Sequence, residues 1–481
     1  MRFPLMSKAL AMGAVLMGLS WALWSVQDVV REREDRRGQA ERSVVNSLAA
    51  SQTLLGPMLL RRCTESWQTT TGEGKSLKYV PEQRELQLIL PPQTVQATSN
   101  VAMEPRHRGI FKVNGYALKA QVDVVWGDLQ ALVPKPQHAN SVIQCEAPVV
   151  SVGITDGRGI RTARLSLQGQ ELPVRSGTQH PLHVQGFHAA LPVAWMADGA
   201  VPARLQGQLT LELAGTRALA VAPVADRTEW TLSAAWPHPS FGGRFLPAER
   251  QITPQGFTAA WRVTSLATTA QRDLLKGLPL CQVSMGDQSQ AMAMRRYTSV
   301  DSGMEEETLK PGSCVETFGV DFVDPVNPYV LSDRATKYGL LFIVLTFVGV
   351  ILVEVLNRLR VHPIQYLLVG MAMTLFFLLL VSLSEHMAFA LAYTIAAGAC
   401  TGLLTFYASH ILDGWRRGLV FGLGTSALYG TLYALLQLEQ SALVLGSFML
   451  FAVLAVIMVM TRRLDWYALF DQMRGQDTPA V

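Results

Sequence analysis

The cysteines are the most reactive side chains in this chain, and their spacing limits what they could do. Cys63, Cys145, Cys281 and Cys314 lie in a stretch that resembles a soluble domain, and none has C-x-x-C spacing, so thiol-oxidoreductase chemistry is disfavoured. Four cysteines allow three pairings. We favour Cys63–Cys145 with Cys281–Cys314, because each pair is close in sequence, and four free thiols are the alternative. Cys400 lies in an apolar run and is expected to be a small packing residue.

Enzyme motifs are mostly missing. Thr71–Ser76 ends like a phosphate-binding loop, but Thr69 stands where the motif requires glycine, so we reject it. Neither H-E-x-x-H nor G-x-S-x-G occurs. His238 lies in a Pro-rich segment and has no partner at metal-ligand spacing, so a structural corner is the better interpretation. The sequence therefore predicts no enzymatic activity, no metal and no cofactor.

Three ionisable residues stand at the ends of apolar runs and are functional candidates for that reason. Glu354 could pair with Arg358 one helical turn on, or it could mark a polar pathway, and the ion pair is favoured. Glu385 and His386 fall in a short turn, where a pH-sensitive site and a solvated turn are equally good explanations. No chain of buried acids follows, which argues against an ion-coupled pump.

The elements that must position these residues follow from composition. The chain has 481 residues, of which 49% are hydrophobic and only 16% charged, whereas soluble domains are about a quarter charged. The first apolar run, Leu10–Trp24, follows Arg2 and Lys8 and lacks an A-x-A-like cleavage site, so we favour an uncleaved anchor over a signal peptide. The charged stretch after it could continue the same helix into water. The net charge of +4 does not indicate nucleic-acid binding.

Five further apolar runs approach the roughly 20 residues that cross a bilayer. They are Tyr338–Val355, Gln365–Leu383, Met387–Ser409, Gly418–Leu438 and Ala442–Met460. Basic residues fall in alternate loops, at Arg358 and Arg360, Arg416 and Arg417, and Arg462 and Arg463. The positive-inside rule then predicts that both termini are cytoplasmic and residues 25–337 periplasmic. Four arginines just after the first run oppose this, but acidic neighbours interleave with them: Arg31, Arg33, Arg36 and Arg37.

The region before the second apolar run is predicted to be β-rich. Glu85–Leu90 alternates with period two, and Ala163–Leu167, Leu205–Leu213 and Ala218–Val224 do so less clearly. Turn signals separate such stretches: Asn114-Gly115, Asp156-Gly157 and Gly242-Gly243. About a dozen short strands, as one sandwich or two β modules, are expected.

The predicted fold class is therefore an α+β membrane protein. Its parts are a transmembrane anchor (1–24), a charged helical extension (25–52), a periplasmic β-rich, sandwich-like domain (53–337), a bundle of five transmembrane helices (338–463) and a cytoplasmic tail (464–481).

Glycines recur at intervals of four in the predicted bundle. They are Gly398 and Gly402 in one run, and Gly414, Gly418 and Gly422 around the start of the next. Small residues at this spacing let helices approach closely. We favour packing within the chain over dimerisation.

Six segments closely resemble the CreD family of inner-membrane proteins and run in family order. They are SVGITDGRGI (Ser151–Ile160), WPHPSFGGRFLPAER (Trp236–Arg250), SDRATKY (Ser332–Tyr338), VHPIQYLLVG (Val361–Gly370), SLSEH (Ser382–His386) and TRRLDWY (Thr461–Tyr467). The opening, with its short anchor and Leu55-Gly56-Pro57-Met58, is also similar. The segment Cys281–Met304 and the cysteines do not resemble the family.

The resemblance implies a role in envelope integrity, colicin tolerance and a two-component response linked to β-lactam resistance. It transfers no catalytic residues. The residues that it offers as structural or coupling candidates are Trp236, Pro237, His238, Pro239, Asp333, Arg334, Lys337 and Tyr338.

Two functional hypotheses follow. In the first, the periplasmic domain of a non-enzymatic protein binds an envelope component or partner protein while the bundle anchors it in the lipid bilayer. In the alternative, the bundle is the conduit of a transporter or lipid-handling protein, with Glu354, Glu385 and His386 as its polar groups. A sensor passing signals inward is disfavoured by the short cytoplasmic loops.

Overall fold

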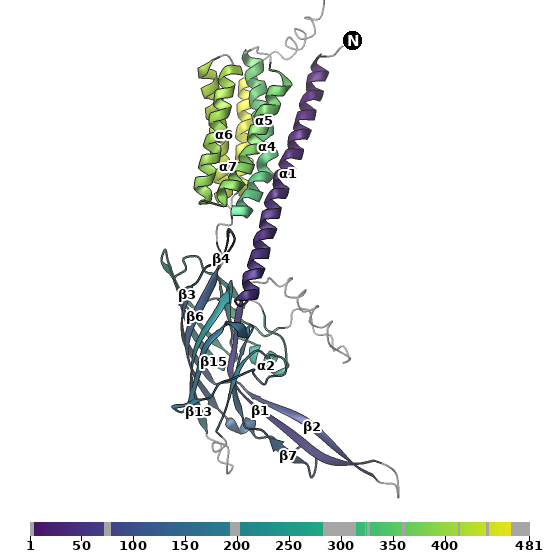
Figure 1. The fold of residues 1–481 in the computed structure, drawn as a ribbon, viewed down its shortest axis with the longest axis vertical. Helices are drawn as coiled ribbons and strands as arrows, with labels where there is room; N and C mark the ends of the chain where they lie inside the picture. Colours follow the sequence, from purple (N-terminus) through teal and green to yellow (C-terminus); the bar gives the residue numbers. More distant parts are fainter. Residues whose placement is uncertain are drawn as a thin grey trace, which may run out of the picture. The chain divides into compact units, whose positions relative to one another are not determined.

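The chain divides into two compact units, Met1–Gly38 with Val326–Val481, and Gln39–Pro325. The computed structural model in Figure 1 describes residues 4–71, 78–192, 203–281, 314–322, 324, 328–357, 361–411, 414–438 and 442–462. Several predictions lie outside these residues: those for Arg358, Arg360 and Arg463, for the phosphate-loop-like segment beyond Thr71, and for the tail 464–481.

Helix α1 (Pro4–Ser47) is continuous, as the absence of Pro and Gly from the charged stretch Gln27–Arg37 suggested. It begins in the first unit and ends in the second. The helix stops at Ser47, earlier than the expected residue 52, because β1 begins at Gln52.

The second unit contains two large sheets around one hydrophobic core. In the first sheet the order is β11 (Arg175–Ser176), β12 (Gly186–Ala190), β8 (Val149–Ile154), β1 (Gln52–Thr71), β14 (Ala218–Ala222), β19 (Phe318–Asp321) and β16 (Ser240–Gly243), and β2 (Lys78–Leu90) and β7 (Val142–Cys145) also pair with β1. In the second it is β10 (Gln170–Leu172), β9 (Ile160–Leu167), β13 (Arg204–Thr216), β6 (Gly115–Gly127), β3 (Thr94–Met103), β15 (Arg227–Ala234), β18 (Gly256–Thr264) and β17 (Glu249–Thr253). A separate hairpin consists of β4 (Arg106–Arg108) and β5 (Phe111–Val113).

One sandwich, rather than two β modules, results from this arrangement. Strands β3 and β15 alternate between buried and more exposed positions, as strands with one face in a core do. Leu54 and Val150 from the first sheet share a core with Trp126 and Trp261 from the second. Because both sheets bury their inner faces in the same cluster, neither could fold stably without the other.

Strand β1 is far longer than any strand that the sequence predicted. It has 20 residues, whereas strands usually have 3–10. Its first half pairs with β14 and β8, and its second half pairs with β2 and β7. Figure 1 shows the far parts of β1 and β2, with β7, projecting away from the sandwich. We call the paired segments Leu59–Thr71 and Lys78–Leu90 the arm.

The alternation that marks a strand is absent from the start of β1 for a physical reason. Leu54 and Leu59 face the main core, while Leu55, Met58 and Leu60 belong to a second cluster on the other face of the sheet. The short helix α2 (Ala270–Leu275) contributes to that cluster. A strand that is buried on both faces shows a continuous apolar run instead of period two.

The first unit holds the apolar helices. They are α4 (Pro328–Asn357), α5 (Pro363–Ser384), α6 (Phe389–Ile411), α7 (Trp415–Gln437) and α8 (Ala442–Thr461), together with the first part of α1. Among the described residues, α1, α4, α5, α6 and α7 are long and apolar enough to span a membrane. The apolar stretch of α8 is shorter, Val444–Val459. Leu19 and Leu23 of α1 pack in the same core as α4 to α7.

Helix α4 begins at Pro328 instead of the predicted Tyr338. Asp333 and Lys337 form an i,i+4 ion pair at 2.6 Å on its early turns. The charged residues in this segment lower its hydropathy, so the start of the helix was not predicted from apolar runs. Ion pairs between residues i and i+4 nevertheless favour helices.

Candidate functional site

The end of α1 is held to the β domain by two residues of the SVGITDGRGI segment. The Arg158 guanidinium donates hydrogen bonds to the carbonyl oxygens of Asn46 (2.5 Å) and Val45 (3.4 Å). It also donates to both Asp156 carboxylate oxygens, at 2.9 and 2.6 Å. The last carbonyls of a helix lack partners within it and carry partial negative charge, so a guanidinium is a suitable cap.

Asp156 is the centre of this clamp. It accepts a further hydrogen bond from the Ala50 backbone N–H at 3.0 Å, just beyond the helix. The hydrogen bonds from Arg158 hold the pKa of the Asp156 carboxyl below its usual value. Gln52 at the start of β1 donates to the Asp156 carbonyl oxygen at 3.0 Å. The connection from α1 to β1 is thus fixed at several points.

The end of β19, the last strand of the β domain, is also held by hydrogen bonds. They are made by Phe322, which directly follows β19. Asn114 donates to the Phe322 carbonyl oxygen (3.1 Å), and the Phe322 backbone N–H donates to the Arg217 carbonyl oxygen (2.8 Å). Arg217 in turn pairs with Glu41 of α1 at 3.3 Å, and the Thr216 hydroxyl donates to the Ala49 carbonyl oxygen at 2.9 Å. We call this set of contacts, with the Arg158 clamp, the junction.

The arm is braced by a disulfide and a buried carboxylate. Cys63 on β1 is bonded to Cys145 on β7. Two residues on, Glu65 is fully buried and accepts hydrogen bonds from the Ser141 hydroxyl (2.7 Å), the Gln137 N–H (2.8 Å) and Arg84 (3.0 Å). The hydrogen bond from Ser141 contributes most to lowering the pKa of Glu65, and with the other bonds it brings that pKa to about 2, although burial opposes the shift.

A histidine-containing loop lies at the base of the arm. The Arg62 guanidinium (2.8 Å) and the Gln87 side chain (3.0 Å) both donate to the Gln179 carbonyl oxygen. His180 Nδ1 accepts from two backbone N–H groups of the loop, and burial lowers its pKa to about 4. His183 Nε2 lies 3.2 Å from the Leu278 carbonyl oxygen. The imidazoles therefore hold the loop in place.

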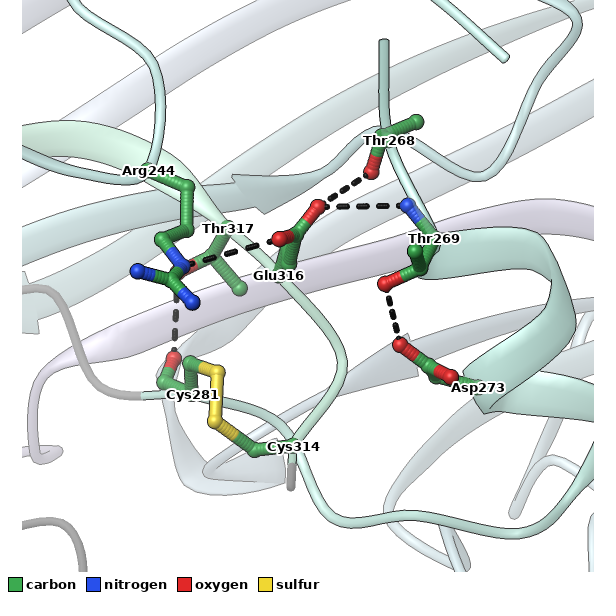
Figure 2. The surroundings of a disulfide bond; sticks show 8 residues. All are labelled: Arg244, Thr268, Thr269, Asp273, Cys281, Cys314, Glu316 and Thr317. Carbon is green, nitrogen blue, oxygen red and sulfur yellow. Dashed lines mark hydrogen bonds and ion pairs between the residues drawn. A yellow bond between two sulfur atoms is a disulfide. The ribbon is translucent and has the colours of Figure 1, made fainter. Parts of the chain in front are cut away.

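A second disulfide joins Cys281 and Cys314 beside an ionic network, shown in Figure 2. Glu316 accepts from the Thr268 hydroxyl at 2.7 Å and pairs with Arg244 at 3.5 Å. Arg244 belongs to the WPHPSFGGRFLPAER segment. The structure thus contains the cysteine connectivity that sequence proximity favoured, and the network ties one resembling segment to the outer face of the first sheet.

The same segment contributes Ser240–Gly243 to β16, at the edge of the first sheet, and its last two residues begin β17 of the second sheet. Trp236 Nε1 donates to the carbonyl oxygen of His238, which is itself exposed, and Pro237 and Pro239 are half-buried. Gly242-Gly243 was predicted to be a turn and is instead part of β16. Gly243 has φ +85°, and a Cβ there would lie 2.2 Å from the Thr317 carbonyl oxygen, so glycine is needed for close strand pairing.

In the first unit, Glu354 joins the end of α4 to the start of α5. Its carboxylate accepts from the Tyr366 hydroxyl (2.7 Å) and from the Val361 backbone N–H (3.2 Å). His362 caps α5 with Gln365 in a capping box. Four residues of the VHPIQYLLVG segment therefore build this turn. Glu354 has a structural role in it, whether or not it also pairs with Arg358.

Glu385 is a partner of the charged stretch of α1. It pairs with Arg33 at 3.5 Å and accepts from the Tyr329 hydroxyl at 3.3 Å. Arg31 and Arg36 pair with acids of α1 itself, Asp28 and Glu32. His386 is exposed, and Arg334 and Tyr338 are half-buried on α4. The arginines that opposed the orientation rule are thus mostly compensated by acidic partners.

The sequence-predicted candidates do not converge on one site. Glu354 contacts the first residues of α5, and Glu385 follows its last residue. Since α5 has 22 residues, they are about 33 Å apart along its axis. In the part of the chain that the structure describes, no three His, Cys, Asp or Glu side chains could hold a metal ion.

Sequence reasoning missed the clamp and the Glu65 cluster. Asp156 was predicted only as a turn residue. Its side chain accepts a hydrogen bond from the backbone N–H two residues on, at Arg158, and this local pattern is common for Asp. Glu65 has no such local signal, because its partners Ser141 and Gln137 are more than 70 residues away.

Comparison with known proteins identifies the family. A sequence model described as "Inner membrane protein CreD" matches residues 4–467. The chain is 32% identical to the inner membrane protein CreD of Escherichia coli strain K12 over 462 residues, which covers 95% of this chain and 92% of that protein.

Among solved structures, an open-gate secretin of the Salmonella SPI-1 type III secretion injectisome aligns with 56% of this chain and 72% of its own. The identity is 7% and the TM-score 0.07, so this match carries no structural argument. The family match and the relative agree over almost the whole length, and the chain belongs to the CreD family of inner membrane proteins.

Proposed function

We propose that this multi-pass inner-membrane protein supports cell-envelope integrity without catalysis. In this account its β domain lies in the periplasm and binds an envelope component or a partner protein through the arm. The lipid bilayer is the partner of the helices, and nucleic acid has no part.

Two observations support a periplasmic β domain. Both disulfides lie in it, Cys63–Cys145 and Cys281–Cys314, and disulfides persist in oxidising compartments. Exposed Arg416 and Arg462 lie at helix ends that alternate connectivity puts on the opposite side of the membrane. Both termini are then cytoplasmic.

The braced arm carries the proposal. A long two-stranded ribbon in water is only marginally stable, yet here a disulfide, a buried carboxylate cluster and a Trp67–His138 ring stack at 3.8 Å hold it. The described part of β2 presents Tyr79, which is 70% exposed, and Val80, which is 42% exposed. The bracing fixes the arm and leaves the Tyr79 ring exposed. This suits a protein-binding element, since tyrosine is among the residues that contribute most to binding energy at interfaces.

Complementation tests this proposal. In a strain that lacks the protein, we expect the wild-type chain to restore resistance to bile salts and hydrophobic antibiotics. Tyr79→Ser with Val80→Ser should fail to restore it at equal membrane abundance, whereas Ile252→Ser, on the exposed strand β17, should restore it. Full rescue by the arm variant would remove the arm from the function.

The alternative, a transporter or lipid-handling protein that uses Glu354, Glu385 and His386, has less support. The two carboxylates bind groups at opposite ends of α5, and His386 is exposed. A conduit requires polar groups that follow one another through the bundle.

A further inference from the structure

A cavity of about 640 Å³ opens between α6 and α7. This volume lies within the ~300–1,000 Å³ that is usual for ligand sites. Its lining combines glycines with aromatic side chains, among them Gly398, Gly402, Gly430, Tyr393, Tyr429 and Trp415. We call this cavity the α6–α7 groove.

Glycines of these two helices serve two different purposes. A Cβ at Gly418 would lie 2.6 Å from Ser409, and one at Gly422 would lie 2.1 Å from Thr405, so these glycines permit close helix packing. At Gly398 and Gly402 no atom of the described residues lies within 4 Å of the added Cβ. The prediction of packing within the chain is therefore wrong for Gly398 and Gly402, which leave space.

The floor of the groove offers little to a polar ligand. The Tyr393 hydroxyl donates to the Tyr429 carbonyl oxygen at 2.6 Å, and the Tyr429 hydroxyl lies 3.1 Å from Cys400 Sγ. The Thr394 and Thr405 hydroxyls donate to carbonyl oxygens of their own helix. Thr401, Ser426 and Tyr433 also line the groove, but most of its exposed lining is apolar, so the surface is suited to an acyl chain.

One end of the groove differs from the rest. Trp415 (66% exposed) and Phe406 (61% exposed) line it there, and the Phe406 ring lies 4.7 Å from that of His410. Arg416, next to Trp415 on the first turn of α7, is exposed. Tryptophan favours the membrane–water interface, and basic residues at the ends of interhelical pockets bind anionic headgroups.

We propose that the α6–α7 groove binds one anionic glycerophospholipid, with an acyl chain over Gly398 and Gly402 and the phosphate beside Arg416. The apolar floor selects an acyl chain, and the positive charge at the aromatic end selects the anionic headgroup. This site is independent of the arm and of any partner in the periplasm.

The test uses the full-length protein in detergent micelles and native mass spectrometry. Phosphatidylglycerol and phosphatidylcholine with the same acyl chains are added in turn. We expect one phosphatidylglycerol to be retained in preference to phosphatidylcholine. Arg416→Gln should lower its retention roughly fivefold, the factor for one basic residue at an anionic headgroup. Gly402→Leu, which fills the groove, should abolish it.

Matched controls separate the groove from general effects. Gly424→Leu alters another open, exposed glycine of α7 that does not line the groove, and Arg462→Gln alters another exposed arginine at a helix end. Both should retain phosphatidylglycerol like the wild type. If Gly402→Leu is not monodisperse, Gly398→Leu replaces it. Equal retention of the two lipids, or unchanged retention by both groove variants, overturns the proposal. Protein dimers that Gly402→Leu abolishes would assign the groove to a second copy and overturn it as well.

Discussion

Arg158 donates a hydrogen bond to the Asn46 carbonyl oxygen, at the end of a 44-residue helix that begins among the membrane helices. Since the same guanidinium is held by Asp156, the helix end and the β domain cannot separate without breaking charge-assisted hydrogen bonds. A segment that resembles the CreD family thus fixes the last turn of α1 to the β domain.

Arg158→Ala should lower the free energy of unfolding of the β domain, because it removes charge-assisted hydrogen bonds to Asp156 and to the last carbonyl oxygens of α1. Since the Arg158 side chain is 53% exposed, solvent screening keeps this effect modest. Chemical denaturation of the full-length protein in detergent, followed by tryptophan fluorescence, measures the change. Arg164→Ala, an exposed arginine on β9, is the control and should change stability by less than about 0.5 kcal/mol. Equal effects of the two substitutions would contradict a capping role.

The oxidation state of the cysteines in cells should show in which compartment the β domain lies. Of the five cysteines, four are paired and Cys400 is free and buried. In a periplasmic domain the pairs stay oxidised, so unfolding without reductant should leave one thiol to react with a polymer-linked maleimide. Prior reduction should raise the number to five. Five reactive thiols without reductant would place the domain in the cytoplasm.

Acid should weaken the bracing of the arm through Glu65. Its pKa is lowered from 4.5 to about 2 in the folded protein, so its contribution to stability is complete above pH 4.5 and is lost as the pH falls towards 2. Glu65→Gln should therefore destabilise the protein at neutral pH, and its difference from wild type should shrink between pH 4.5 and 2. Protease cleavage rates of the arm measure this, with Glu85→Gln on the exposed face of β2 as control. A difference that is constant with pH would show that ionisation of Glu65 is irrelevant.

The turn between α4 and α5 should depend on the Tyr366 hydroxyl. Tyr366→Phe removes a hydrogen bond to the buried Glu354 carboxylate and should cost about 1–3 kcal/mol, since it leaves a buried charge less well satisfied. The midpoint of thermal unfolding in detergent reports the loss. Tyr407→Phe alters a half-buried tyrosine of α6 and serves as the comparison. If both substitutions behave alike, the hydroxyl does not support the turn.

The helices were predictable from sequence because long apolar runs carry their own signal. Predicted and observed bounds differ by three residues or fewer for α5 to α8, for example Gln365–Leu383 against Pro363–Ser384. The start of α4 was missed because Asp333 and Lys337 interrupt its hydropathy. Helix propensity was informative there, and apolarity was not.

The β domain was predictable only in class. Strand β1 combines a doubly buried apolar half with a polar half in the arm, and neither half alternates clearly. Apart from the Glu65–Arg84 pair, the contacts of Glu65 and those of Arg158 with the end of α1 join residues between 72 and 113 positions apart, such as Arg158 with Val45. Local patterns contain no information on such pairings, which depend on sheet topology.

The most direct test of the central claim is photo-crosslinking in living cells from the arm. A benzophenone amino acid at Tyr79 should give a discrete adduct with an envelope component or a partner protein. The same amino acid at Ile252, exposed on β17 of the same domain, should not give that adduct. Absence of an adduct from Tyr79, or the same adduct from both positions, would contradict the assignment of binding to the arm.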